Sequence, residues 1–264
     1  MGVPFDWWRD SAFRLEQAGY DGIWCWDHFT SRGSRPNVVL ECWTTLTAVA
    51  AVSDRIRVGT LVANVMNRHP AVLARMAATL QEVSRGRLVL GIGIGGHPAE
   101  HEAYGIPFPP VAERVARLEE AVAVLRALWS GEPVTRAGPF YPLRDAIALP
   151  RPEPMPPIIV GGQSPGGARL AARVGDGWTT RPDLLDELLP VYRKAADELG
   201  RDPGPVIVAW EGGRAGVDAL TGSPWIDDPA GEWERWRRRG STGVVLVART
   251  TADVDRLVDA AGRW

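Results

Sequence analysis

Asp27 and His28 are the first residues whose types and position could do chemistry, because they directly follow the apolar run 23–26. A continuous apolar run indicates a strand that is buried on both faces, as in a parallel sheet. Ligands of α/β folds bind at the carboxyl ends of such strands, where an imidazole can act as a general acid or base. The alternative is that Asp27 only caps a turn and that His28 is a solvated loop residue.

A glycine-rich stretch at 91–96 follows a second apolar strand and formally satisfies the pattern G-x-G-x-x-G. A dinucleotide fingerprint would also need a helix that begins at once and an acidic residue about twenty positions further on. His97 and Pro98 follow instead, and no strand that ends in Asp or Glu lies at the right distance. We therefore expect these glycines to let the backbone approach a flat ligand closely at the mouth of a barrel.

The segment 97–101 matches the inverted zinc motif H-x-x-E-H, whose two histidines would share one face of a helix. Pro98 lies where that helix would only be starting, and no third ligand is evident, so no metal site is predicted. The stretch 161–165 (GGQSP) follows an apolar strand and precedes a helix, an arrangement that can bind an anion. A plain glycine-rich turn is the alternative there. Arg68 could contact an anion or cap a helix.

Strands and helices alternate along the chain, which indicates parallel strands joined by right-handed crossovers. Seven strands are one short of a (β/α)8 barrel, and the missing strand is the first. Residues 2–5 could supply a short strand, another chain could cover the gap, or the true start could lie upstream. The predicted strands begin near residues 22, 55, 88, 157, 177, 206 and 244, the predicted helices cover 6–18, 41–52, 70–83, 111–129, 166–174, 183–199 and 251–261, and a hairpin is predicted around 140–141.

Composition narrows the class of protein. With 264 residues and 45% hydrophobic content, the chain can build one domain over residues 1–264. The net charge of −2 favours neither nucleic acid nor an anionic membrane surface as a partner. Cys25 and Cys42 make no disulfide framework, and no apolar run approaches the ~18 residues of a membrane span. We expect a cytoplasmic protein.

Several stretches, in order along the chain, together resemble the luciferase-like monooxygenase family. The resemblance implies a (β/α)8 barrel that binds FMN or the 8-hydroxy-5-deazaflavin coenzyme F420 at its carboxyl face. The single barrel would lack a full first strand. The matching stretches are 22–29, 58–62 with 68–70, 86–95, 102–109, 117–120, 128–131, 157–162 and 171–178.

The resemblance also implies roles for individual residues. Asp27 would contact the coenzyme ring, and His28 would lie near the hydride-carrying carbon as acid or base, which suits an imidazole. A cis peptide bond between Leu61 and Val62 would back the central ring of the coenzyme. The other implied coenzyme contacts are Ile94, Gly95, Gly161, Gly162, Gln163 and Ser164, and Trp26 and His97 would line the substrate side.

The leading hypothesis is a deazaflavin-dependent oxidoreductase that transfers hydride between F420 and a small organic substrate. Sugar-phosphate dehydrogenases of this branch carry a glutamate at the position of Gly96 and a tryptophan at that of Arg32, so glucose 6-phosphate is not the expected substrate. One alternative is an FMN-dependent monooxygenase that uses O2. Another is a degenerate, non-catalytic member that binds a flavin or a partner. We expect a homodimer.

Overall fold

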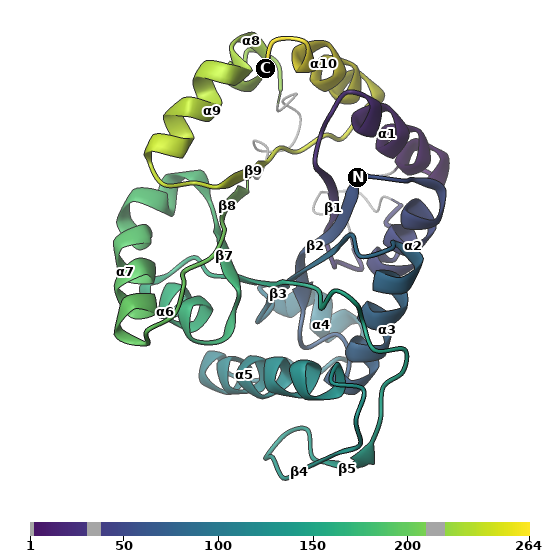
Figure 1. Cartoon of the computed structure of the whole chain (residues 1–264), viewed down its shortest axis with the longest axis vertical. Helices are drawn as coiled ribbons and strands as arrows, with labels where there is room; N and C mark the ends of the chain where they lie inside the picture. The colour runs from purple at the N-terminus through teal and green to yellow at the C-terminus, as the bar shows by residue number, and fades with distance from the viewer. Residues whose placement is uncertain (1–2, 31–37, 210–219) are drawn as a thin grey trace.

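Seven parallel strands curve into a ring, and the helices lie outside it (Figure 1). The computed structural model describes residues 3–30, 38–209 and 220–264. The strands are hydrogen-bonded in the order β1-β2-β3-β6-β7-β8-β9. Their bounds are β1 (Gly22–Cys25), β2 (Arg57–Asn64), β3 (Leu88–Gly93), β6 (Ile158–Gly161), β7 (Gly177–Thr180), β8 (Val206–Ala209) and β9 (Gly243–Val245).

The helices pack their apolar faces on the outside of this sheet, and the core lies between the two layers. Two helix starts follow directly from the sequence. The Glu41 carboxylate accepts from Thr44 N (2.7 Å) at the start of α2, and Thr250 and Asp253 form a capping box at the start of α10. The helices are α1 (Phe5–Gln17), α2 (Cys42–Val52), α3 (Pro70–Val83), α4 (Pro98–Ala103), α5 (Val111–Leu128), α6 (Pro165–Val174), α7 (Leu185–Glu198), α8 (Pro224–Asp227), α9 (Pro229–Arg238) and α10 (Thr251–Ala261), with a 3-10 turn at Pro182–Leu184.

The predicted strand–helix alternation is confirmed, with small differences at the element ends. Helix α1, predicted over 6–18, begins one residue earlier at Phe5, with Pro4 as its N-cap, and ends at Gln17. Helix α9 was not predicted, because it is rich in charged residues and its buried face carries few apolar side chains. Residue 210 of the predicted strand 206–210 lies outside the described residues.

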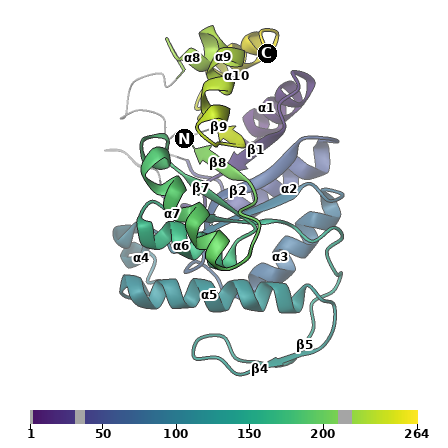
Figure 2. The same ribbon diagram turned by 60° about the vertical axis from the view of Figure 1, so that its left-hand side comes forward.

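The predicted hairpin is confirmed by β4 (Val134–Arg136) and β5 (Leu143–Ala146), which pair antiparallel. It lies outside the barrel, beside α5 (Figure 2). Glu120 on α5 fastens the loop of the hairpin, since its carboxylate accepts from the backbone N–H groups of Phe140 (3.1 Å) and Tyr141 (2.8 Å). Within the described ranges, no helix combines the length and apolarity needed to cross a membrane.

The ring has one open seam, between β1 and β9. Each of these strands pairs with a single neighbour in the sheet, β1 with β2 and β9 with β8. Residues 3–5 form no strand: Val3 and Pro4 are irregular and Phe5 begins α1, while Gly2 lies outside the described residues. Within residues 3–30, 38–209 and 220–264 the barrel has seven strands and no strand between β1 and β9, as predicted, and residues 3–5 do not supply one.

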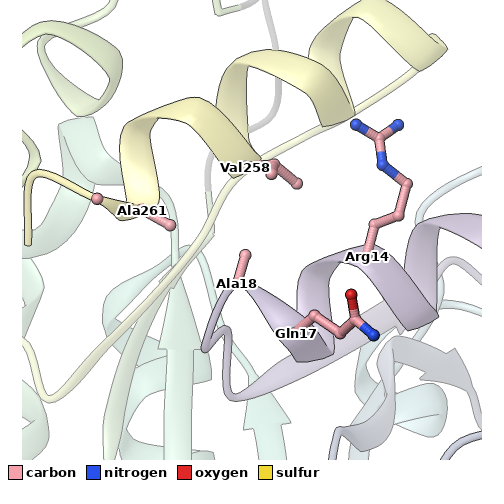
Figure 3. Close-up of a pocket in the computed structure, with 6 residues that line it drawn as sticks. Arg14, Gln17, Ala18, Val258 and Ala261 are labelled. Atoms are coloured by element: carbon pink, nitrogen blue, oxygen red, sulfur yellow. The ribbon is translucent and has the colours of Figure 1, made fainter.

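Helices α1 and α10 close the seam from outside. Arg14 Nη2 donates to Asp255 Oδ1 (2.6 Å), and the Tyr20 hydroxyl donates to Leu257 O (2.8 Å). A surface pocket lies between the last turns of the two helices (Figure 3). It is near the amino end of β1, so it is separate from the end of the strand that leads to His28. Its lining residues are Arg14, Gln17, Ala18, Val258, Ala261 and Gly262.

Candidate functional site

Glycines of β3 and β6 pack around the side chain of Val62 near the carboxyl ends of β2, β3 and β6. The Leu61–Val62 peptide bond is cis, as the sequence resemblance implied, and the β2–β3 register shifts between Thr60 and Ala63. Beyond this bulge, both methyl groups of Val62 face Gly161, at 3.3 Å from the position that a Cβ would take there. Strand β6 therefore has no room for a larger side chain beside Val62.

The glycines of β3 are required by close approach of neighbouring atoms. A Cβ added at Gly91 would clash with the carbonyl oxygen of Thr60, and one at Gly93 would lie 2.9 Å from Val62 Cγ2. Gly95 has a φ of +76°, which favours glycine, and a Cβ there would lie 2.7 Å from Asn64 Oδ1. These glycines therefore make room for neighbouring protein atoms: the backbone of Thr60 and the side chains of Val62 and Asn64.

Asp27 lies at the end of β1 and is only 3% exposed. Its carboxylate accepts from both terminal nitrogens of Arg68 (2.6 and 2.9 Å) and from the Asn64 backbone N–H (2.9 Å). Although burial lowers the pKa of Arg68, the hydrogen bonds and charge of Asp27 outweigh it and hold that pKa above its ordinary value. Arg68 thus binds an anion of the protein itself, and the cap of α3 is His69.

His28 follows Asp27 and pairs with a buried carboxylate from another element. Its Nδ1 lies 2.9 Å from Glu100 Oε2, in the first turn of α4. The other oxygen of Glu100 accepts from the backbone N–H groups of Phe29 and Thr30. Burial raises the pKa of Glu100, but the hydrogen bonds from these three residues outweigh it and hold the pKa below its ordinary value. Glu100 is therefore an ionised acceptor at neutral pH.

Two aromatic rings flank the imidazole of His28. The ring of His97 lies edge-on at a centroid distance of 4.8 Å, and that of Trp26 lies edge-on at 6.2 Å. All three side chains are half-buried. The structure therefore brings together the three residues that the sequence placed at the reacting side of the pocket.

A hydrogen-bond network joins the end of β2 to α4, and the loop after β3 to α5. Asn64 Oδ1 accepts from Met66 N (3.0 Å), so its Nδ2 is the donor toward His101 Nε2 at 2.7 Å. Burial lowers the pKa of His101, which agrees with a neutral ring that accepts at Nε2. From the first turn of α5, Arg114 donates to the carbonyl oxygens of Ile94 (2.9 Å) and Gly95 (2.7 Å). This guanidinium fixes the backbone of the predicted coenzyme loop.

Some polar groups of the loop after β6 are already hydrogen-bonded within the protein. Gly162 N donates to Thr179 O (3.0 Å), and Gly162 O accepts from Trp178 Nε1 (3.0 Å). Ser164 caps α6 by accepting from Gly167 N (3.1 Å). Gln163 and Ser164 are exposed. The anion-binding role of this loop stays a prediction that must rest on the first turn of α6 and on these two side chains.

The H-x-x-E-H segment does not converge on one point. His97 contacts the ring of His28 edge-on, Glu100 accepts from His28, and His101 bonds to Asn64. In the part of the chain that the structure describes, no group of three or more His, Cys, Asp or Glu side chains could hold a metal ion. Arg32, which bears on the expected substrate, lies outside the described residues.

These features define a protein with a (β/α)8-type barrel and a site at the carboxyl ends of its strands. Residues 2–214 match the family model described as luciferase-like monooxygenase, and the chain belongs to that family. A protein of Kineococcus radiotolerans named F420-dependent glucose-6-phosphate dehydrogenase is 39% identical over 75% of this chain and 60% of its own length. The phthiodiolone/phenolphthiodiolone dimycocerosates ketoreductase of Mycobacterium bovis is 38% identical over 74% of this chain and 57% of its own length.

The chain thus spans about three fifths of the length of these curated relatives. Among solved structures, an F420-dependent secondary alcohol dehydrogenase in complex with an F420-acetone adduct superposes with a TM-score of 0.85. That comparison covers 100% of this chain and 95% of the other, at 23% sequence identity, and it shows the shared fold.

Proposed function

We propose that this protein is an oxidoreductase that transfers hydride between coenzyme F420 and a small organic substrate. The observation that carries the proposal is the partly exposed imidazole of His28, held after the carboxyl end of β1 by the buried carboxylate of Glu100. The F420-dependent activities named for the relatives support the same class of reaction. The expected homodimer and cytoplasmic location belong to this proposal, and light scattering of the purified protein checks the dimer.

The packing around the cis bond fixes Val62 as the side chain that would back a planar coenzyme. Gly91, Gly93 and Gly161 leave room for its methyl groups, which lie within 3.3 Å of the position of a Cβ at each of them. Val62 is itself half-buried, so a flat ring would lie against its accessible side. The predicted holders of the ring are Leu61, Val62, Ile94 and Gly95, with Gly161, Gly162, Gln163 and Ser164 toward the phosphate side. When bound, F420 supplies the hydride chemistry.

The residues of the protein have two tasks: to position the parts of the site and to transfer a proton. Asp27 acts through Arg68 and Asn64, because its carboxylate is engaged by both, so we assign it to fixing the end of β1 and the start of the β2 loop. His28 takes or gives the proton of the substrate oxygen as the hydride moves. Trp26 and His97 confine the substrate beside that imidazole.

Coenzyme binding tests the proposal directly. Titration of the purified protein with F420 and with FMN, followed by tryptophan fluorescence, should show F420 bound at least about ten-fold more tightly. A preference for FMN would favour the alternative of an FMN-dependent monooxygenase. Binding of neither would refute both enzyme hypotheses and would leave the non-catalytic alternative.

The role of His28 has its own test. His28→Ala should abolish turnover of reducible carbonyl substrates while F420 binding is retained. His69→Asn is the matched control, because His69 is exposed, caps α3 and is not part of the cluster. Turnover that survives in His28→Ala would remove the assigned role. Glucose 6-phosphate serves as a further substrate control, and we expect no oxidation of it.

A further inference from the structure

We infer that Glu100 is a positioning residue that holds His28 in the Nδ1–H tautomer and so presents Nε2 as the proton-handling atom. The hydrogen bonds of Glu100 carry this inference. Its Oε1 is occupied by the backbone N–H groups of Phe29 and Thr30, with the Thr30 hydroxyl at 3.5 Å. Its Oε2 faces the imidazole nitrogen at 2.9 Å. One oxygen thus anchors the loop after β1, and the other orients the ring.

The chemistry of a carboxylate fixes which atom carries the proton. An ionised carboxylate accepts hydrogen bonds and cannot donate one. His28 Nδ1 must therefore be the donor, and in the neutral ring Nε2 then carries a lone pair. The tautomer of His28 thus follows from its hydrogen-bond partner, the Glu100 carboxylate. A ring in this state can take a proton at Nε2 and, once charged, return it there.

Burial separates the two members of the pair. The Glu100 side chain is 6% exposed, whereas that of His28 is 26% exposed. A substrate can therefore reach the imidazole but not the carboxylate, so Glu100 acts through His28. The edge-on rings of His97 and Trp26 restrict rotation of the imidazole and keep Nδ1 toward Glu100.

A purely structural role is the competing explanation, because Glu100 also ties α4 to the loop after β1. A second connection between the same elements makes the two roles separable. The Tyr104 hydroxyl donates to Phe29 O (3.4 Å), and the two rings lie 5.0 Å apart. Loss of the charge on Glu100 should therefore leave the loop in place and change mainly the state of His28.

Glu100→Gln is the informative variant. Its amide oxygen can still accept from Phe29 N and Thr30 N, but its NH2 group must donate where Oε2 accepted. His28 Nδ1 then has to accept, and the proton moves to Nε2. Heteronuclear NMR of the imidazole nitrogens above neutral pH should show Nδ1–H in the native protein and Nε2–H in the variant. We expect kcat to fall by about 10²–10⁴-fold, as for carboxylates that orient a catalytic histidine.

Glu102→Gln is the matched control, because Glu102 is exposed on the same helix. It should keep the tautomer and kcat, and both variants should bind F420 within about two-fold of the native protein. Backbone amide signals of Phe29 and Thr30 should be retained in Glu100→Gln. Native His28 in the Nε2–H form, or a variant that keeps Nδ1–H, would overturn the inference.

Equal kcat values in Glu100→Gln and Glu102→Gln would also overturn it, by leaving the tautomer without catalytic consequence. If Glu100→Gln fails to fold, the tautomer of His28 in the native protein still tests the inference. The catalytic part of the inference rests on the proposed function, but the tautomer measurement needs neither coenzyme nor turnover. Failure to bind F420 would therefore refute the proposed function alone, and an Nε2–H signal would refute only the role of Glu100.

Discussion

The stability of the protein should depend strongly on keeping both partners of the buried ion pair Asp27–Arg68, because loss of one leaves the charge of the other uncompensated. The Asp27 side chain is 1% exposed and that of Arg68 12%, so water cannot replace either partner. Arg68→Met would remove both charge-assisted hydrogen bonds to Asp27 and leave its carboxylate buried beside the Asn64 backbone N–H. Breaking a buried pair in this way costs about 3–5 kcal/mol.

Urea unfolding, followed by tryptophan fluorescence, measures this loss as a lower midpoint and a smaller free energy of unfolding. In a thermal scan the same loss should lower Tm by about 6–20 °C for a chain of this size. Arg9→Met is the control, because Arg9 pairs with Asp6 at the surface, where the two side chains are 48% and 73% exposed. A pair of that kind is worth about 1 kcal/mol or less.

The double variant Asp27→Asn/Arg68→Met removes the stranded charge and should regain at least about 1 kcal/mol relative to Arg68→Met. The reasoning would be refuted by a loss below about 1 kcal/mol in Arg68→Met, because the pair would then behave like a surface pair. It would also fail if the double variant were less stable than Arg68→Met, since no uncompensated charge would then explain the loss.

Two further predictions concern the packing and the titration of the barrel. In Gly91→Ala the new Cβ would clash with Thr60 O, so β2 and β3 must separate, and urea unfolding should show a loss of about 1–3 kcal/mol. Gly96→Ala, where nothing lies within 4 Å, should change stability by less than about 0.5 kcal/mol, and equal losses in the two variants would contradict this explanation. Burial lowers the pKa of His101 from 6.5, so below that pH the unfolded chain takes up the proton first. The contribution of neutral His101 to the free energy of unfolding is therefore complete above about pH 6.5 and declines as the pH falls toward its folded pKa. Urea midpoints measured against pH should show this decline, and His101→Gln should make it less steep. The same pH dependence in the native protein and the variant would contradict the explanation.

The sequence predicted the elements well because their signals are local. Pro70 in the first turn of α3 and the apolar runs of β3 and β6 are visible within a few residues, and the helix Pro70–Val83 has the predicted bounds. The convergence of Trp26, His28 and His97 also followed, since the carboxyl ends of parallel strands meet at one end of the barrel.

The partners of the site residues could not be predicted, because they depend on side-chain directions across elements. Glu100 is 72 positions from His28 and Arg68 is 41 positions from Asp27. In the sequence, Glu100 stood only within a zinc-like pattern, and Arg68 suggested an anion contact or a helix cap. The useful sequence signal for Glu100 would have been an acidic residue in the first turn of a short helix that directly follows a glycine-rich strand end.

The open seam gives the two sides of the site different freedom to open. Val62 and the glycines packed around it lie on β2, β3 and β6, each hydrogen-bonded to two neighbours, whereas His28 follows β1, which has one. Amide exchange should therefore be faster in β1 and β9 than in the strands between them. The ion pair of Arg14 with Asp255 joins α1 to α10 outside the barrel at this seam. We therefore expect the imidazole to follow the part of the ring that opens first, and the predicted coenzyme contacts on β2, β3 and β6 to lie on the part that opens last.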